Sequence, residues 1–256
     1  MIHFFKYQAT GNDFVMIDNR MGMFDKENIN LIEKICDRRF GVGGDGVILV
    51  EEHVDLDFEM IYYNSDGTQS LCGNGSRAAV MFTRDLGIID DGAQFMTISG
   101  ELSAGINGNI VHLLMPDVSY VGNHNDDYLV DTGSPHYVRF TDNVEKLVVE
   151  TEGPKIRFNP HFEGGINANF AEITGSDSIF VRTYERGVEA ETYSCGTGVT
   201  ACALAGSLKG LKSPVSIQTL GGKLQVSFEN YGKGEFRNIY LIGPAEKVFE
   251  GDIVSI

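Results

Sequence analysis

The stretch Cys72-Gly73-Asn74-Gly75-Ser76-Arg77-Ala78-Ala79-Val80-Met81-Phe82 returns in altered form as Cys195-Gly196-Thr197-Gly198-Val199-Thr200-Ala201-Cys202-Ala203-Leu204-Ala205. In each copy a cysteine and a short glycine-containing turn precede a run of small and apolar residues. Such a run predicts a helix that starts just after the cysteine, and a helix that is apolar on nearly all sides is buried. We therefore predict two buried helices, over residues 74–86 and 197–209, each with a cysteine at its start.

The repeat extends beyond the two cysteine motifs. Cys195 follows Cys72 by 123 positions, and two further pairs of segments match at an offset of 122: Thr10-Gly11-Asn12 with Thr132-Gly133-Ser134, and residues 97–102 with 219–224. A period this long does not fit a solenoid, but it fits a duplicated domain. We predict one half over residues 1–117 and another over 118–242, with the tail 243–256 packing back on the first half.

The remaining pattern is rich in strands. Further helices are predicted over 28–39 and 142–150, and Asn107-Gly108 between two apolar runs is a strong hairpin signal. Strands are predicted over 2–7, 14–18, 47–51, 57–63, 109–115, 136–140, 166–173, 178–184, 215–219 and 237–242. The predicted fold class is α/β (α+β): two pseudo-symmetric domains, each a curved, mainly antiparallel sheet around a central helix, with the active site in the cleft between them.

Composition limits the classes of function. The chain has 256 residues, 36 acidic against 20 basic, and a formal charge of −16, which disfavours nucleic acid and anionic membrane surfaces as partners. The N-terminus lacks the pattern of a signal peptide and no apolar run is long enough to span a bilayer, so we expect a cytoplasmic protein. The four cysteines show no CxxC spacing, which argues against a metal site, and Cys36 and Cys202 are expected to be small buried residues.

The chemistry follows from the position of Cys72 and Cys195. A helix N-terminus carries partial positive charge and unpaired N–H groups, so it lowers the pKa of a thiol there and attracts an anion. Two such ends facing one cleft would place an acid and a base on opposite sides of the α-carbon of an amino acid. The backbone at Gly73-Asn74 and Gly196-Thr197 would hold its carboxylate. Inversion by one thiolate and one thiol requires no metal and no cofactor.

Other motifs remain open to two interpretations. Gly41-Val42-Gly43-Gly44-Asp45-Gly46 matches GxGxxG, but it follows a helical pattern and precedes a strand, the reverse of a dinucleotide site, so we interpret it as a tight turn. Asn64 and Asp66 suit either turn chemistry or the cleft. Arg186 suits a substrate carboxylate and Glu185 an ammonium group. His136 is either a satisfied core residue or a cleft residue.

These motifs, taken together and in this order, resemble the diaminopimelate epimerase family over nearly the whole chain. The shared elements are residues 11–15, 41–45, 64–67, 72–75, 135–136, 167, 185–187 and 195–198. The resemblance implies cofactor-independent interconversion of LL- and meso-2,6-diaminopimelate in lysine and cell-wall synthesis. It also implies a fold of two pseudo-symmetric domains and pairing into a homodimer.

The resemblance also implies roles for individual residues. Cys72 and Cys195 are the catalytic thiols, the first a proton donor and the second an acceptor in one direction, and His136 and Glu185 assist them. The substrate-binding residues are Asn12, Asn64, Gly73, Asn74, Asn167, Glu185, Arg186, Gly196 and Thr197. The chain departs from the family pattern at Ser134, where Asn is common, at Gly46, where some members have Gln, and in the turn 189–191.

Two alternatives stay open at this point. The first is a proline or hydroxyproline racemase, which also uses two thiols, although Arg186 and the several Asn residues favour a substrate with a second polar end. The second is a protein without catalytic activity that binds amino acids or senses oxidants through its thiols. Exchange of the α-proton with solvent distinguishes an enzyme from either form of the second alternative.

Overall fold

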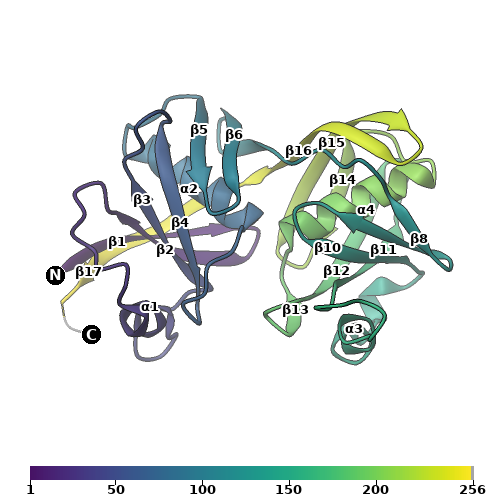
Figure 1. Cartoon of the computed structure of the whole chain (residues 1–256), viewed down its shortest axis with the longest axis horizontal. Coiled ribbons are helices and arrows are strands. Elements are labelled where there is room, and N and C mark those ends of the chain that lie inside the picture. The colour runs from purple at the N-terminus through teal and green to yellow at the C-terminus, as the bar shows by residue number, and fades with distance from the viewer. Residues whose placement is uncertain (255–256) are drawn as a thin grey trace. The chain divides into compact units, whose positions relative to one another are not determined.

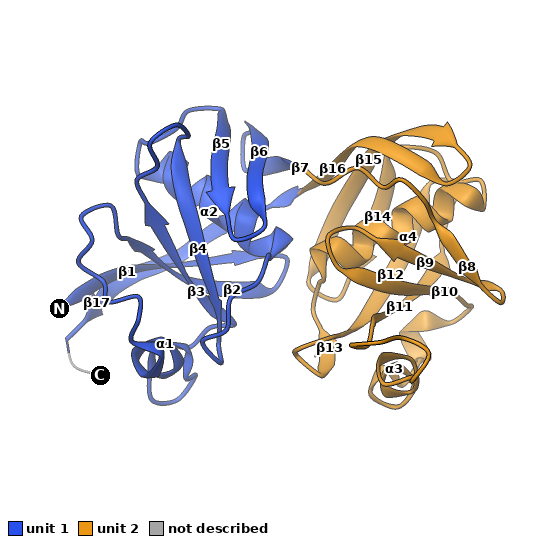
Figure 2. Cartoon of the chain, in the orientation of Figure 1, with its two compact units in different colours: residues 1–113, 243–256 blue, residues 114–242 orange. Residues whose placement is uncertain are grey.

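The computed structural model describes residues 1–254 and divides into two compact units (Figures 1 and 2). The first unit holds residues 1–113 together with the segment from 243 onward, and the second holds residues 114–242. Each unit combines one sheet with a central helix and a peripheral helix, so the predicted mixed fold of repeated halves is confirmed.

The sheet of the first unit has eight strands, and the chain does not follow their order. Its two parallel pairs are β2–β3 and β4–β5, and the other neighbouring strands are antiparallel. In spatial order the strands are β17 (Glu246–Ile253), β1 (Ile2–Ala9), β2 (Asn12–Asp18), β3 (Gly46–Glu51), β4 (Phe58–Asn64), β5 (Gly92–Thr97), β6 (Gly100–Asn107) and β7 (Ile110–Leu114).

The sheet of the second unit repeats this pairing scheme strand for strand. Parallel pairs occur at β10–β11 and β12–β14, the positions that correspond to those in the first unit, and β13 (Ala190–Thr192) adds to β12. The spatial order is β8 (Gly122–His124), β9 (Asp127–Asp131), β10 (Pro135–Phe140), β11 (Asn167–Ile173), β12 (Ser178–Glu185), β14 (Val215–Thr219), β15 (Gly222–Gly232) and β16 (Glu235–Pro244).

The two central helices are α2 (Gly73–Asp85) and α4 (Gly196–Leu208), each of 13 residues. Helix α2 packs against β1–β4 and β17, and α4 against β9–β12, β14 and β15. Both are buried on nearly every side over their first ten residues, apart from Thr197 in α4, as the small and apolar side chains require. Cys72 and Cys195 are the N-cap residues, so the two predicted cysteine helices are confirmed to within one residue.

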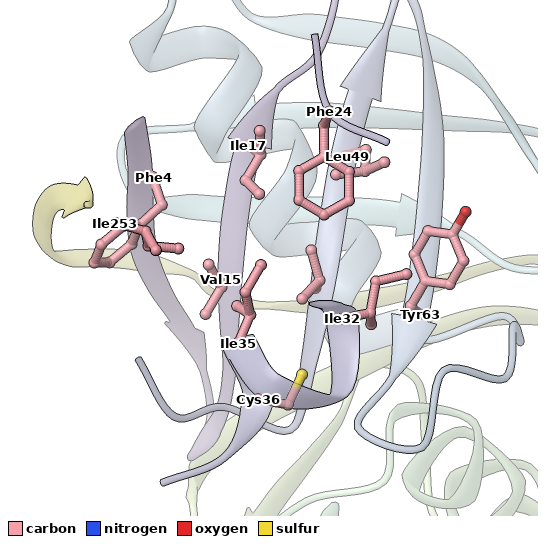
Figure 3. Close-up of a cluster of buried hydrophobic side chains, with 11 residues drawn as sticks. Phe4, Val15, Ile17, Phe24, Ile32, Ile35, Cys36, Leu49, Tyr63 and Ile253 are labelled. Atoms are coloured by element: carbon pink, nitrogen blue, oxygen red, sulfur yellow. The ribbon is translucent and has the colours of Figure 1, made fainter. Parts of the chain in front are cut away.

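The first unit has a second core beneath helix α1 (Ile29–Cys36), shown in Figure 3. Ile32 and Ile35 lie on the inner face of the helix and pack with Val15, Leu49 and other strand residues. The helix ends earlier than the predicted 28–39 because the Asp37 side chain accepts hydrogen bonds from the backbone N–H groups of residues 39 and 40, which turns the chain.

The predicted helix over 142–150 is wrong. Only a single 3₁₀ turn, η1 (Val144–Lys146), forms there, and helix α3 (Val149–Arg157) follows it. Asn143 has left-handed backbone angles and makes no side-chain cap. Arg182 from the neighbouring strand donates to the carbonyl oxygens of Val144, Glu145 and Leu147, so these groups are satisfied without a continuous helix.

The predicted strands are all present, and the hairpin signal at Asn107-Gly108 is confirmed by the β6–β7 turn, where Gly108 has a φ of +62°. The strands β5, β8, β9, β13 and β17 were not predicted; most are short, half exposed or interrupted by polar residues. None of the helices within residues 1–254 has the length and apolar character that a membrane span requires.

Candidate functional site

The candidate residues of the first unit gather at one edge of its sheet. Strand β2 begins at Asn12, β3 begins at Gly46 and β4 ends at Asn64. Gly46 pairs with both Phe14 and Asn64, so the parallel and antiparallel neighbours bring these strand ends to the same edge. The positive N-terminal end of α2, capped by Cys72, belongs to the same unit, and the contacts below join it to this edge.

Cys72 is held between a donor and an acceptor. The backbone N–H of Gly75 donates to its Sγ at 3.3 Å, and the thiol donates to Oδ1 of Asn12 at 3.6 Å. The same Asn12 oxygen accepts from Nδ2 of the buried Asn74 at 3.2 Å. A thiolate would keep the Gly75 bond, and a thiol can use both, so the position accommodates either protonation state.

Asn12 is in turn fixed by a cluster of charges. Its Nδ2 donates to Oδ2 of Asp45 at 2.6 Å. Arg38 joins Asp45 to Asp13 at 2.7 and 2.5 Å, and buried Lys6 lies 2.6 Å from Asp13. Burial pushes the pKa of Asp13 upward, but hydrogen bonds from Arg38 and Lys6 hold it below its usual range. The side chain of Asn12 is therefore set in one orientation.

Asn64 and Asp66 form a turn. The Asn64 amide donates to the Thr68 carbonyl and hydroxyl oxygens and to Ser70 Oγ, at 3.0–3.1 Å. Asp66 Oδ1 accepts from the N–H and the hydroxyl of Thr68. These contacts satisfy both side chains inside the loop after β4, so Asn64 shares the sheet edge with Asn12 without joining its hydrogen-bond network.

The loop of residues 41–46 is a helix-ending turn, as predicted. The N–H groups of Val42, Gly43 and Gly44 donate to carbonyl oxygens at the end of α1, so they serve the helix and are not directed at a phosphate. A Cβ at Gly46 would lie 2.3 Å from the Tyr63 carbonyl oxygen and 2.4 Å from the Tyr62 ring. A side chain therefore does not fit at position 46 of this chain without a shift of backbone.

The second unit gathers its candidates at the corresponding edge. His136 near the start of β10 pairs with Asn167 at the start of β11, and β12 ends at Glu185. Cys195 caps α4, as Cys72 caps α2, but its side chain does not close a capping hydrogen bond. Its Sγ lies 3.5 Å from the hydroxyl of Thr197.

Thr197 connects Cys195 to His136. The Thr197 hydroxyl oxygen lies 2.9 Å from His136 Nε2, and the Thr197 carbonyl accepts from buried Thr132 at 2.9 Å. On the other side of the ring, Asn169 Nδ2 lies 3.1 Å from His136 Nδ1 and also donates to the Tyr137 carbonyl oxygen. Because Nδ2 is a donor, Nδ1 accepts, and Nε2 carries the proton that it donates to Thr197.

His136 is a neutral imidazole in this setting. The side chain is fully buried, and burial together with the charge of Arg186 lowers its pKa to about 3. A base of this strength would remain unprotonated at neutral pH, so the ring acts as a fixed donor and acceptor and does not itself take up a proton.

Asn167, Ser134 and Arg186 form a second polar cluster. Asn167 Nδ2 donates to Ser134 Oγ and to the Pro135 carbonyl, each at 2.9 Å, and its Oδ1 accepts from the Arg186 N–H at 2.8 Å. Arg186 Nη2 lies 3.5 Å from Ser134 Oγ. Thr192 donates to Glu185 Oε2 at 2.9 Å. Ser134 therefore links two of the predicted substrate-binding side chains within this cluster.

The remaining cysteines are unsuited to acid–base work. Cys36 and Cys202 are buried, and burial raises the pKa of Cys36 to about 12 and raises that of Cys202 as well. Within residues 1–254, His, Cys, Asp and Glu side chains do not gather in groups of three or more that could hold a metal ion.

Sequence reasoning missed three polar residues of these networks: Arg77, Asn169 and Thr132. Arg77 donates to Asn74, Asn169 to His136, and Thr132 to the Thr197 carbonyl. A signal existed for Arg77, a lone cation in an otherwise apolar helical run, and for Asn169, which lies two residues after Asn167 and so on the same face of its strand. Thr132 was seen only as part of a repeat.

Solved structures share this fold at low sequence identity. A phenazine biosynthesis protein of the PhzF family from Bacillus anthracis aligns with a TM-score of 0.76 and 17% identity over 99% of both chains. A hydroxyproline epimerase from Agrobacterium vitis aligns with a TM-score of 0.73 and 12% identity over 98% of this chain and 90% of that one.

Sequence comparison is more specific. A curated diaminopimelate epimerase from Flavobacterium psychrophilum is 50% identical over 254 residues, which covers 97% of this chain and 99% of that protein. One from Aquifex aeolicus is 38% identical and covers 98% and 97%. The model of the family described as diaminopimelate epimerase matches residues 4–120 and 128–248. The family model matches both halves of the chain in order, and Cys72 and Cys195 hold equivalent N-cap positions in the two halves. The chain therefore belongs to the diaminopimelate epimerase family.

Proposed function

We propose that this chain interconverts LL- and meso-2,6-diaminopimelate, with Cys72 and Cys195 on opposite faces of one α-carbon. The observation that carries the proposal is the identity of 50% to a curated diaminopimelate epimerase over nearly the full length of both chains. It is supported by the equivalent N-cap positions of the two cysteines in the two units. We further propose that the two units are the duplicated halves and that substrate binds where both thiols can contact it.

The reaction needs only proton transfers. One thiolate removes the α-proton, forming an S–H bond, and the electron pair of the broken C–H bond delocalises into the α-carboxylate. The other thiol then delivers its proton to the opposite face of the carbon, so the configuration is inverted. The first backbone N–H groups of α2 and α4, at Gly73-Asn74 and Gly196-Thr197, are proposed to stabilise the charge on the carboxylate.

The proposed binding groups fall into two sets. Asn12 and Asn74 lie against Cys72 and would orient the carboxylate beside it, while Asn64 would shape the same edge through its loop. Asn167 and Arg186 form the polar cluster that would hold the far end of the substrate, with Arg186 paired to the distal carboxylate.

Cys195 is proposed to act with Thr197 and His136. Because His136 donates to the Thr197 oxygen, the hydroxyl hydrogen is directed away from the ring and can reach Sγ at 3.5 Å. A donor aimed at sulfur stabilises the thiolate when Cys195 is the base. Glu185 at the end of β12 is proposed to contact the substrate ammonium group near this thiol, which would balance charge as the proton moves.

The test is exchange of the α-proton. LL-diaminopimelate incubated with the protein in D₂O should yield the meso form with deuterium at the inverted carbon, followed by NMR. Cys72→Ala and Cys195→Ala should each abolish epimerisation, because each removes one of the two proton carriers. The matched control is Cys202→Ala, in the same helix as Cys195 but fully buried, and it should retain activity.

Each alternative predicts a different result in that assay. A racemase for proline or hydroxyproline would exchange the α-proton of those substrates and leave diaminopimelate unchanged. A protein that only binds amino acids or responds to oxidants would bind ligand or form oxidised thiols without any exchange. Folded protein that leaves LL-diaminopimelate undeuterated would refute the proposed activity.

The family resemblance also supports a homodimer in the cytoplasm. Light scattering across a range of protein concentrations measures the mass in solution, which for a dimer is twice the 28.1 kDa of one chain. A monomer at all concentrations would exclude the dimer without affecting the proposed chemistry.

A further inference from the structure

Arg77 is a fully buried cation in helix α2. Its side chain is 0% exposed, and none of the ion pairs formed within residues 1–254 includes it. Its Nε has no hydrogen-bond partner there. Buried charges in proteins are ordinarily paired, because an unpaired one costs several kcal/mol. The burial of this guanidinium without an ion pair therefore needs an explanation.

The guanidinium is folded back toward the start of helix α2. Nη1 lies 3.5 Å from the Gly73 carbonyl oxygen, and Nη2 donates to Asn74 Oδ1 at 3.1 Å and to Thr10 Oγ1 at 3.2 Å. All three acceptors are neutral. The positive charge is thus set beneath the first turn of the helix, the turn that Cys72 caps.

Two hydrogen bonds connect Arg77 through Asn74 to Asn12, the residue that accepts from the Cys72 thiol. Because Asn74 Oδ1 accepts from Arg77, its Nδ2 must face the other way, where it donates to Asn12 Oδ1 at 3.2 Å. That same oxygen accepts from the Cys72 thiol. The orientation of Asn74, and through it the position of the Asn12 oxygen, therefore depends on Arg77.

The placement is unfavourable for the fold alone. A cation near a helix N-terminus opposes the helix dipole, and burial adds the cost of desolvation. Burial lowers the pKa of Arg77 to about 10, and the nearby Cys72 acts in the opposite direction. Arg77 nevertheless remains a cation at neutral pH.

The second unit provides an internal comparison. Thr200 occupies the position in α4 that Arg77 occupies in α2, five residues after the cysteine, and its hydroxyl donates to the Gly196 carbonyl at 2.9 Å. Helix α4 has the same length and is equally buried, so a cation is not required to build such a helix. Its cysteine instead lies beside Thr197, whose hydroxyl contacts the neutral His136.

We propose that Arg77 is a positioning residue whose buried charge stabilises the thiolate of Cys72 and whose hydrogen bond to Asn74 orients Asn12 against it. That this thiolate serves as an acid–base group rests on the proposed function, but its existence does not. The two thiols are then unequal in the substrate-free protein. Cys72 has a permanent neighbouring cation, whereas Cys195 lies beside the neutral hydroxyl of Thr197.

The test reads the thiolate directly. In a Cys195→Ala background Cys72 is the reactive thiol, since Cys36 and Cys202 are buried and protonated. Arg77→Met and Arg77→Gln should lower the rate constant for iodoacetamide alkylation of Cys72 at pH 7 by about 3-fold or more, because a nearby opposite charge shifts a pKa by about 1–3 units and a more basic thiolate reacts somewhat faster. Arg77→Lys should preserve most of the rate.

The matched control is Arg84→Met, in the same helix but partly exposed and paired with Asp85, which should leave the alkylation rate unchanged. Circular dichroism establishes that each variant is folded. If folded Arg77→Met and Arg77→Gln react as fast as the parent, the proposal is overturned. A merely structural role would alter thermal stability without changing the rate constant in the folded protein.

A second measurement applies even if these variants do not fold. In the folded Cys195→Ala protein, the absorbance near 240 nm that alkylation removes gives the thiolate fraction of Cys72 at pH 7. We expect at least several times the few per cent of an ordinary thiol with a pKa of about 8.5. A fraction of a few per cent refutes the proposal. Neither measurement uses substrate, so failure of epimerisation and failure of this inference are distinguishable.

Discussion

At the scale of single residues, the two cysteines differ chiefly in the polar groups behind them. Behind Cys72 stand Asn12, Asn74 and the cation of Arg77, and behind Cys195 stand Thr197 and the neutral ring of His136. A symmetric reaction at one carbon needs two exchangeable protons but not two identical surroundings. Each set of polar groups instead fixes the positions of the hydrogen-bond partners around its own cysteine sulfur.

The buried His136 predicts a loss of stability in acid. Its pKa of about 3 lies below the 6.5 of an unfolded histidine, so the unfolded chain binds more protons as the pH falls below 6.5. This stability is fully present above pH 6.5 and is lost progressively toward pH 3. Between pH 7.5 and 5 the free energy of unfolding should fall by about 2 kcal/mol from this residue. Urea unfolding at the two pH values measures the difference.

The variant His136→Gln tests whether the loss of stability in acid comes from this histidine, because glutamine does not titrate. This variant should be less stable at pH 7.5 because it disturbs the contacts to Thr197 and Asn169, but its acid dependence should be smaller by about 2 kcal/mol. The exposed His161, changed to Gln, serves as the control and should keep the full acid dependence. An unchanged acid dependence in His136→Gln would contradict a neutral buried ring.

Sequence reasoning located the cysteines because their surroundings are local: a cap, a glycine turn and an apolar run all lie within a dozen residues. It could not decide between the two interpretations of Asn64, since the turn bonds to Thr68 and Ser70 form only when the loop closes. Asn169 was missed because its partner His136 lies 33 positions away and meets it only through the parallel pairing of β10 and β11.

At the scale of elements, the helices that could be predicted are those whose own residues are small and apolar enough to indicate burial. Helices α2 and α4 were located to within one residue because small apolar side chains continue for three turns. Helix α3 was misplaced because its start depends on Arg182, a residue of β12 that takes up the carbonyl groups of the preceding turn. No local pattern reveals that contact.

Helix α3 provides a test in which packing outweighs helix propensity. Replacing a helical Gly with Ala normally stabilises a helix by about 1 kcal/mol. A Cβ at Gly153 would lie 2.3 Å from Cβ and 2.4 Å from Cγ of Tyr184, whose hydroxyl donates to the Glu189 carbonyl. Because that ring is anchored at both ends, Gly153→Ala should instead destabilise the protein by about 1–3 kcal/mol, measured by urea unfolding.

The matched control for Gly153 is Gly105→Ala in strand β6. No atom lies within 4 Å of a Cβ built at Gly105, and its φ lies outside the left-handed region, so the change should be neutral or slightly stabilising. Equal effects of the two substitutions would mean that Tyr184 yields to the new methyl group, and the close approach of α3 to β12 would then have no energetic consequence.

At the scale of the whole molecule, the 122–123-residue offset in the sequence corresponds to a strand-for-strand repeat of topology. Parallel pairs at β2–β3 and β4–β5 recur at β10–β11 and β12–β14. The offset could be predicted because matching turns and caps recur at matching positions. The strand β17 could not, since its alternation is weak and its identity as a strand depends on pairing with β1, more than 230 residues earlier in the chain.

The C-terminal strand β17 packs in the first unit, and one of its residues contributes to the hydrophobic core there. Ile253 pairs with Ile2 and joins the cluster of Phe4 and α1 residues seen in Figure 3, with only 8% of its surface exposed. Ile253→Ala should lower the free energy of unfolding by about 2–3 kcal/mol, through lost apolar burial and the cavity that remains. Val248 in the same strand is 57% exposed, so Val248→Ala should change it by less than about 0.5 kcal/mol. Urea unfolding compares the two, and equal effects would mean that β17 contributes to the first unit through its backbone pairing alone.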